Sequence, residues 1–209
     1  MQAFYLTAYG GAAGSASGVA GSAGGGSGLA GWRVLVNGAS GGVGTFAVQI
    51  ARALGATVSA VCGSHNADLV HSLGAEEIFD YRAADFTRAG RRFDLLIDVA
   101  GRRSGRACRS VLPRDGVLAL VGGPAGRWVQ PAGHAFVSLA GGAFARQRVR
   151  LVDAVASPDK GALLTELAAL VKDGRVRPVI DRRYPFPELP AALRYQEAGH
   201  APGKVIVTR

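Results

Sequence analysis

The residues best suited to chemistry form a glycine-rich turn at positions 36–44, with the sequence VNGASGGVG. Aligned on the dinucleotide-binding fingerprint G-x-G-x-x-G, the turn places Ala39 first, Gly41 second and Gly44 third. A small first residue permits a tight exit from a strand, and a second residue without a Cβ lets the backbone approach a pyrophosphate. The third glycine lets the next helix pack closely on the strand, with its N-terminal amides facing the phosphates. The turn therefore predicts a dinucleotide site.

Other interpretations of this turn fit less well. Such a triplet can also be an ordinary strand-to-helix turn. A phosphate-binding P-loop needs Gly-Lys followed by Ser or Thr, whereas Gly44 is followed directly by Thr45. A short-chain reductase would need a Tyr with a Lys four positions later, and none of the five Tyr residues has one. Because the turn follows an apolar strand and opens an amphipathic helix, dinucleotide binding is the favoured interpretation.

The residues that follow the second expected strand bear on which cofactor would bind. An NAD site normally places a carboxylate there to accept a hydrogen bond from the ribose 2′-hydroxyl. No Asp or Glu occurs between Thr45 and Ala67, and residues 62–66 (CGSHN) offer small and hydrogen-bonding groups instead. Since these groups do not repel a 2′-phosphate, the sequence favours NADPH over NADH. Ser64 also has the residue type of a helix N-cap, a role compatible with a phosphate contact.

The elements that would position this turn alternate between apolar strands and amphipathic helices. Strands are expected at residues 33–37, 57–61, 77–80, 93–99, 117–121 and 148–154. Helices are expected after the turn, from Ser64, over residues 104–112 and from Ser157-Pro158, the last with Leu163, Leu164, Leu167, Leu170 and Val171 facing inward. This alternation predicts an α/β fold with a doubly wound parallel sheet covered on both faces.

Composition and charge restrict the function further. The chain has 209 residues, 48% apolar and 19% charged, which allows one large globular domain. The net charge of +9 comes from 21 scattered Arg and three Lys with only 7% aromatic residues, which favours a solvated basic face over specific nucleic-acid binding. No apolar run is long enough for a membrane span and no secretory leader is visible, so we expect a cytoplasmic protein without a membrane partner. Cys62 and Cys108 are too few for a disulfide framework or a structural zinc site, and we expect no metal.

The ends of the chain differ in composition from its centre. Residues 10–31 contain ten Gly, six Ala, four Ser and no charge, which is typical of a flexible linker, natural or engineered. We expect a strand remnant at 1–9, this linker at 10–31, a dinucleotide-binding domain at 32–183, and a C-terminal helix and strand remnant at 184–209. In this arrangement the last strand, residues 204–208, would find only residues 2–7 as its partner.

Several longer motifs carry a family resemblance, in order from about residue 32 to the end of the chain. They are VLVNGASGGVGTFAVQIARALGA, SLGAEEIFDYR, FDLLIDVAG, LALVGGP, GRVRPVIDRRYPF and GHAPGKVIVTR. With these motifs the chain resembles the zinc-independent, quinone-oxidoreductase-like branch of the medium-chain dehydrogenase/reductase superfamily, to which the zinc-type alcohol dehydrogenases also belong. The resemblance implies a Rossmann domain that binds NADPH and transfers hydride to quinones, enones or related carbonyl compounds.

The resemblance also implies roles for individual residues. Ser64 and Tyr81 would lie near the adenosine 2′-phosphate, although Tyr81 could equally be a half-buried residue at the sheet edge. Many relatives place a basic residue at the position of Asn66. Gly122 and Gly123, at the end of a strand, would pass beside the nicotinamide, and no catalytic residue is assigned. The pyrophosphate would be held by the glycine turn, which comprises Ala39, Ser40, Gly41, Gly42, Val43 and Gly44.

One departure from the family pattern affects the expected activity. Family members fold a catalytic domain of about 100 residues or more between the first strand and the Rossmann unit, where this chain has the linker. Because that GroES-like domain forms the second wall of the substrate cleft, hydride transfer should be slow, unselective or absent. The alternatives are a non-catalytic NADPH-binding module and a scaffold that forms a homodimer through a sheet edge at residues 148–154.

Overall fold

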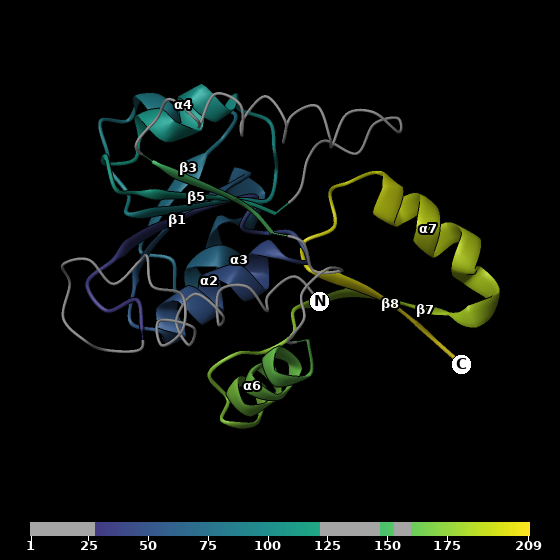
Figure 1. Ribbon diagram of the computed structural model, residues 1–209. Coiled ribbons are helices and arrows are strands. Elements are labelled where there is room, and N and C mark those ends of the chain that lie inside the picture. Colours follow the sequence, from purple (N-terminus) through teal and green to yellow (C-terminus); the bar gives the residue numbers. More distant parts are fainter. Residues whose placement is uncertain (1–27, 122–146, 153–159) are drawn as a thin grey trace.

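A six-stranded parallel sheet forms the centre of the molecule. The computed structural model describes residues 28–121, 147–152 and 160–209 (Figure 1). The strand order is β3-β2-β1-β4-β5-β6, and every neighbouring pair is parallel. The strands are β1 (Arg33–Asn37), β2 (Thr57–Cys62), β3 (Glu77–Asp80), β4 (Leu95–Asp98), β5 (Val117–Leu120) and β6 (Arg148–Leu151). All six strands expected from the sequence are present, and the predicted doubly wound α/β fold is confirmed.

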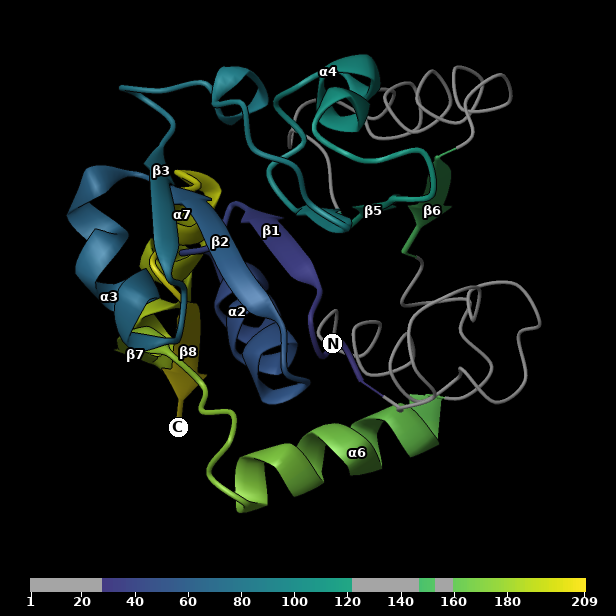
Figure 2. The same cartoon turned by 90° about the vertical axis from the view of Figure 1, so that its left-hand side faces the viewer.

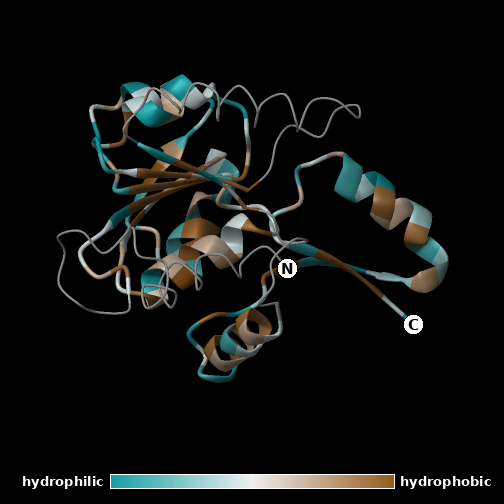
Figure 3. Cartoon of the chain, in the orientation of Figure 1, coloured by the Kyte–Doolittle hydropathy of each residue, from teal (hydrophilic) through white to brown (hydrophobic). Residues whose placement is uncertain are grey.

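Helices cover both faces of this sheet. On one face lie α2 (Gly44–Ala53), the short 3₁₀ turn η2 (Ser64–Asn66) with α3 (Ala67–Ser72), and α6 (Lys160–Lys172). On the other lie α4 (Gly105–Ser110) and the 3₁₀ turn η3 (Phe86–Arg88), so that α4 is separated from α2 by the sheet in Figure 1. Each face has its own cluster of buried apolar side chains. Because the central strands are covered on both sides, they are mostly apolar, as the brown sheet of Figure 3 shows.

Two features of the sheet's surroundings differ from expectation. Leu29, near the end of the predicted linker, is only 3% exposed, and its amide donates to the carbonyl oxygen of Leu54 at 2.8 Å. In α6, which Figure 2 shows along its length, Leu163 and Leu170 are buried, but Leu164 and Val171 are 52% and 38% exposed. The inward stripe of α6 is therefore narrower than predicted, because the helix contacts the rest of the described chain along one line only. Ser157 and Pro158, the expected helix start, lie outside the described residues.

The C-terminal part of the chain forms a second, smaller sheet. It consists of β7 (Ile180–Pro185) and β8 (Lys204–Thr208), which pair in parallel, with η4 (Phe186–Glu188) and α7 (Leu189–Glu197) between them. The expectation that the last strand would find only residues 2–7 as its partner is wrong, since β7 pairs with it. The sequence of β7, IDRRYP, has no apolar alternation and was not recognised as a strand. Residues 2–7 lie outside the described part of the chain.

Among the described residues, no helix has the length and apolar character that crossing a membrane requires.

The junction between β1 and α2 depends on a glycine at position 44. A Cβ there would overlap the carbonyl oxygen of Gly38 and lie 2.7 Å from the Cα of Ala39. We expect Gly44→Ala to lower the free energy of unfolding by about 1–3 kcal/mol, the usual effect of overpacking. Gly161→Ala in α6 is the matched control, because its added Cβ would meet nothing within 4 Å. Urea unfolding followed by circular dichroism measures both, and equal stability of the two variants would contradict this account of the junction.

Candidate functional site

The candidate site lies where the winding direction of the sheet reverses. β1 and β4 are adjacent in the sheet, but the chain leaves β1 toward β2 and leaves β4 toward β5. The loops that follow the two strands therefore run in opposite directions, and their carboxyl ends form the edge at which open α/β sheets have the crevice that binds ligands. The glycine turn follows β1 directly, so the fold places it at this crevice.

The glycine turn is held to the neighbouring strand by its own backbone. Gly38 has a positive φ of 87°, which turns the chain sharply out of β1. The amides of Gly38 and Ala39 then both donate to the carbonyl oxygen of Val61 at the end of β2, at 3.1 and 3.0 Å. Ala39 is fully buried. These contacts fix the position of the turn, and they explain why a small residue is needed at position 39.

The N terminus of α2 presents free donors at this turn. No side chain caps it, and among the backbone hydrogen bonds of the described residues none uses the amide of Val43. A Cβ added at Gly41 would meet only the carbonyl oxygen of Gly38, at an ordinary contact distance of 3.6 Å. The described residues therefore leave the space beside Gly41 unfilled. Uncapped amides and the positive end of the helix dipole are what a phosphate anion requires.

Lys204, at the start of β8, adds a positive charge to the same place. Gly203 pairs with Gly41 in an isolated parallel bridge. A Cβ at Gly42 would lie 2.9 Å from the carbonyl oxygen of Gly203 and 3.4 Å from the Lys204 Nζ. Desolvation lowers the pKa of the Lys204 ammonium, which lies 5.8 Å from the centre of the Phe46 ring. A cation beside the positive end of a helix is unfavourable by itself, so this arrangement is explained best by an anion that bridges both.

A second group of polar side chains gathers at the ends of β2 and β3. A Cβ at Gly63 would lie 2.7 Å from His65 Cε1 and 3.4 Å from Tyr81 Cε1, so both rings pack over this glycine. The guanidinium carbon of Arg82 lies 5.5 Å from the centre of the Tyr81 ring. Tyr81 is 40% exposed, and Ser64 and His65 are exposed as well. The group thus offers a hydroxyl, a phenol, an imidazole and a guanidinium on one surface.

The role of Ser64 as a helix cap was predicted wrongly. Ser64 is the first residue of η2, the N-caps of η2 and α3 are Gly63 and Asn66, and neither makes a side-chain cap hydrogen bond. Ser64 cannot cap these helices because it already lies inside the first turn. Asn66 is buried, and its Nδ2 lies 3.2 Å from His65 Nε2. Its side chain is therefore occupied by the neighbouring imidazole.

A buried hydrogen-bond network joins the two strands that flank the crevice. The side chains of Asn37, at the end of β1, and Asp98, at the end of β4, are 5% and 0% exposed. Asp98 Oδ1 accepts from Asn37 Nδ2 at 2.8 Å and from the amide of Gly101 at 2.9 Å. The thiol of Cys108 donates to Asp98 Oδ2 at 3.9 Å. The network fixes the loop after β4 relative to β1, and the sequence analysis did not find it.

The predicted site residues thus fall into three groups. The residues of the glycine turn, Ala39 to Gly44, lie together at the crevice, and Ser64 and Tyr81 follow the next two strands. Gly122 and Gly123 lie outside the described residues. The sequence analysis missed Lys204 and Arg82; the only signal was that Lys204 sits in the GKVIV motif and that Arg82 follows Tyr81. Within the described ranges, no group of three or more His, Cys, Asp or Glu side chains could hold a metal ion, and the absence of a metal stays a prediction.

Known proteins resemble the chain in sequence and in fold. Residues 73–207 match the family model described as zinc-binding dehydrogenase. The mitochondrial NAD(P)H oxidoreductase RTN4IP1 of Mus musculus is 34% identical and covers 85% of this chain and 48% of its own length. The chloroplast envelope quinone oxidoreductase homolog of Arabidopsis thaliana is also 34% identical, over 83% of this chain and 51% of its own length. The quinone oxidoreductase structure from Coxiella burnetii superposes with a TM-score of 0.72 at 26% identity, covering 86% of this chain and 54% of that one.

These similarities bear on the extent of the chain and on its predicted location. The chain spans about half the length of the curated relatives it matches. The prediction of a cytoplasmic location is wrong, because relatives named as mitochondrial and chloroplastic point to an organelle instead. That prediction looked for an apolar secretory leader, a criterion that does not detect the amphipathic, arginine-rich transit peptides of mitochondria and chloroplasts.

The network around Asp98 leads to a prediction about Cys108. Burial and then the negative charge of Asp98 raise the pKa of this thiol from 9.0 to about 12. We therefore expect the native protein to resist a thiol-reactive disulfide reagent at pH 8, and the unfolded protein to react at both Cys62 and Cys108. Because the folded pKa is raised, the neutral thiol stabilises the fold fully below pH 9 and loses that contribution as the pH rises toward 12.

Cys108→Ser is the matched control, since its hydroxyl keeps the donor to Asp98 and does not titrate in this range. The stability of the wild type relative to this variant should fall above pH 9, as measured by urea unfolding at a series of pH values. A constant difference across that range would contradict the raised pKa.

Proposed function

This chain belongs to the zinc-binding dehydrogenase family, in its quinone-oxidoreductase-like branch, and we propose that it is the nicotinamide-cofactor-binding part of an NADP(H)-dependent oxidoreductase. Its reaction is hydride transfer between NADPH and a quinone, an enone or a related carbonyl compound. The observation that carries this proposal is the convergence of the uncapped N terminus of α2 with Lys204 at the reversal point of the sheet.

The pyrophosphate of the cofactor fits the glycine turn. The free amide of Val43 would donate to its oxygens, and the open space beside Gly41 admits its close approach. The Lys204 ammonium would add a charge-assisted hydrogen bond. The helix dipole and the ammonium, which repel one another in the free protein, would then both face a negative charge.

The preference for NADPH rests on the second polar group. A 2′-phosphate at the ends of β2 and β3 would meet Arg82, His65, Tyr81 and the Ser64 hydroxyl. Arg82 supplies the positive charge that many relatives have at the position of Asn66, whose side chain here is occupied by His65. The carboxylate at the end of β3, Asp80, accepts from the backbone amide of Arg82 at 3.0 Å, so it stabilises the turn that carries this arginine.

In the proposed reaction the cofactor and the protein chain have different roles. A bound nicotinamide supplies the hydride. The chain binds the phosphates, and the network of Asn37 and Asp98 keeps the two sides of the crevice in a fixed relation. No side chain of the described residues is assigned as a proton donor, and water serves that purpose. Because residues 10–31 have the composition of a linker where family members fold a catalytic domain, we expect slow and unselective turnover.

A homodimer through the edge of the large sheet is part of this proposal. β6 pairs with β5 on one side only among the described strands, which leaves its other edge open to a second copy. Two copies joined at β6 would form one continuous sheet and leave both glycine turns accessible.

A fluorescence titration with NADPH and NADH tests the pyrophosphate contact. We expect Lys204→Ala to raise the Kd for both cofactors about tenfold, since a charge-assisted hydrogen bond contributes about 1.5–3 kcal/mol. Lys172→Ala, at the exposed end of α6, should leave both Kd values unchanged. If Lys204→Ala binds both cofactors as tightly as the wild type, this lysine is not a pyrophosphate ligand.

The same titration tests the preference between the cofactors. Arg82→Ala should raise the Kd for NADPH about tenfold and leave that for NADH unchanged, because only NADPH carries the 2′-phosphate. Arg194→Ala, an exposed arginine of α7, is the matched control. Equal weakening of both cofactors would show that Arg82 acts on the fold and not on the phosphate.

An assay of NADPH oxidation distinguishes an enzyme from a module that only binds the cofactor. With NADPH and a panel of quinones and enones, we expect a slow fall in absorbance of the reduced cofactor. Cofactor binding without any turnover would favour a non-catalytic NADPH-binding module, and no binding at all would favour a scaffold.

A further inference from the structure

The loop that follows β4, residues 99–103, lies where the nicotinamide half of the cofactor would extend. This placement rests on the proposed function, in which the pyrophosphate lies at the glycine turn after β1 and the 2′-phosphate lies at the ends of β2 and β3. In the order β3-β2-β1-β4-β5-β6, the adenosine half is then on one side of β1. The nicotinamide half extends from the pyrophosphate in the other direction, and it therefore comes to the residues that follow β4.

The loop after β4 is attached directly to the start of the glycine turn. The amides of Val99 and Ala100 both donate to the carbonyl oxygen of Asn37, at 3.0 and 3.3 Å. A Cβ added at Gly38 would lie 3.2 Å from the Ala100 nitrogen and 3.3 Å from its Cβ, so the two backbones are in close contact. A displacement of this loop would therefore change the space that the nicotinamide half has beside the turn.

Two buried side chains fix the next residue of the loop. Asp98 Oδ1 accepts from Asn37 Nδ2 at 2.8 Å and also from the amide of Gly101 at 2.9 Å. Gly101 is buried, and its positive φ of 61° turns the chain at this point. One carboxylate oxygen thus connects β1 with the loop, while the thiol of Cys108 in α4 donates to the second oxygen.

The stability of the fold alone does not explain a carboxyl group at the end of β4. Asp98 is fully buried, and burial of such a group costs free energy that its hydrogen bonds must offset. Replacement of buried ionic groups by apolar side chains is often neutral for stability. What an apolar side chain lacks is direction, since the Asp98 oxygen sets both the distance and the angle of the Gly101 amide. The network is therefore explained better by the loop that it orients.

We propose that Asn37 and Asp98 are positioning residues for the nicotinamide half of the cofactor, and that they act through the backbone of residues 99–101, which supports that half. Neither side chain touches the cofactor, because both are buried. Their loss should therefore weaken the contacts of the nicotinamide half. The contacts of the pyrophosphate and the adenosine half, which lie at the glycine turn and at the ends of β2 and β3, should stay unchanged.

Isothermal titration calorimetry with two ligands tests this proposal. NADPH has both halves, whereas 2′-phosphoadenosine 5′-diphosphate has the adenosine, the 2′-phosphate and the pyrophosphate but no nicotinamide half. We expect Asn37→Ala to raise the Kd for NADPH about fivefold, the usual effect of one hydrogen bond, and to leave the Kd for the diphosphate unchanged. Asp98→Asn keeps an oxygen that can accept from Asn37 and Gly101, so its Kd for NADPH should stay near that of the wild type.

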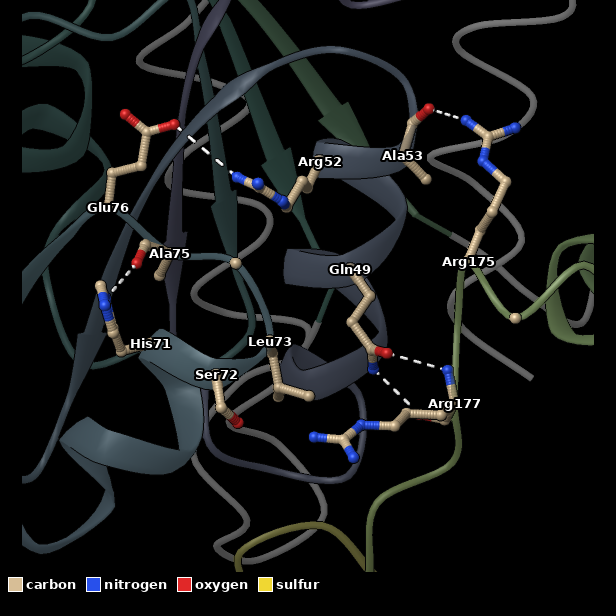
Figure 4. Close-up of a pocket in the computed structure, with 12 residues that line it drawn as sticks. Gln49, Arg52, Ala53, His71, Ser72, Leu73, Ala75, Glu76, Arg175 and Arg177 are labelled. Carbon is tan, nitrogen blue, oxygen red and sulfur yellow. Dashed lines mark hydrogen bonds and ion pairs between the residues drawn. The ribbon is translucent and has the colours of Figure 1, made fainter.

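The matched control removes a buried amide elsewhere, in the second half of α2. Gln49 is as deeply buried as Asn37, and its side chain bonds both backbone polar groups of Arg177 (Figure 4). Gln49→Ala should therefore destabilise the fold as well, yet leave the ratio of the two Kd values as in the wild type. Circular dichroism verifies that each variant is folded. Asn37→Thr, whose β-branched side chain suits a strand, replaces Asn37→Ala if that variant does not fold.

The possible results distinguish this proposal from the proposed function. A selective rise in the Kd for NADPH in Asn37→Ala, absent in Asp98→Asn and Gln49→Ala, supports the positioning role. Equal effects of Asn37→Ala on both ligands, no effect on either, or the same selective rise in Gln49→Ala would overturn that role while the cofactor site stands. If the wild type binds neither ligand, the proposed function itself fails and the positioning role with it.

Discussion

The contact on which the candidate site depends is the one between the start of α2 and the end of β1. The backbone of Gly44 lies so close to Gly38 and Ala39 that no side chain fits between them. This distance sets the position of α2 on the sheet, and the hydrogen bonds from Gly38 and Ala39 to Val61 then tie the same turn to β2. Because Gly41 is not needed for this packing, its missing side chain leaves space for a ligand. Two glycines three positions apart thus serve different purposes, one the fold and the other binding.

The helix that begins at this turn has basic side chains near both of its ends. At its N terminus no side chain caps the helix and Lys204 lies beside it, whereas at its C terminus the guanidinium of Arg175 donates to a terminal carbonyl and Gln49 bonds the backbone of Arg177. The two ends differ in sign, so an anion at the first is assisted by the helix dipole and an anion at the second is opposed by it.

The sequence predicted the strands of the large sheet because the central ones are buried on both faces and therefore mostly apolar. It predicted the glycine turn because its spacing is a local property. It did not predict β7, whose residues Asp181, Arg182 and Arg183 are polar since neither face of the small sheet is fully covered. Nor did it place Lys204, which reaches Gly42 across about three-quarters of the chain by tertiary contact alone. The Asn37–Asp98 hydrogen bond could not be predicted from the sequence for the same reason. The two residues meet only because β1 and β4, which are distant in sequence, pair in the sheet.

The position of Lys204 also changes the interpretation of the C-terminal segment. Residues 184–209 were predicted to be a C-terminal helix and strand remnant, and two of them reach the glycine turn. Gly203 pairs with Gly41, and Lys204 lies at the start of α2. The pairing of β7 with β8 brings these residues there, since Gly203 packs closely against Val179, directly before β7. A two-stranded sheet is marginally stable by itself, so contact with the glycine turn stabilises β8 while β8 supplies the turn with a cation. The C-terminal segment is therefore part of the candidate cofactor site and depends on it in return.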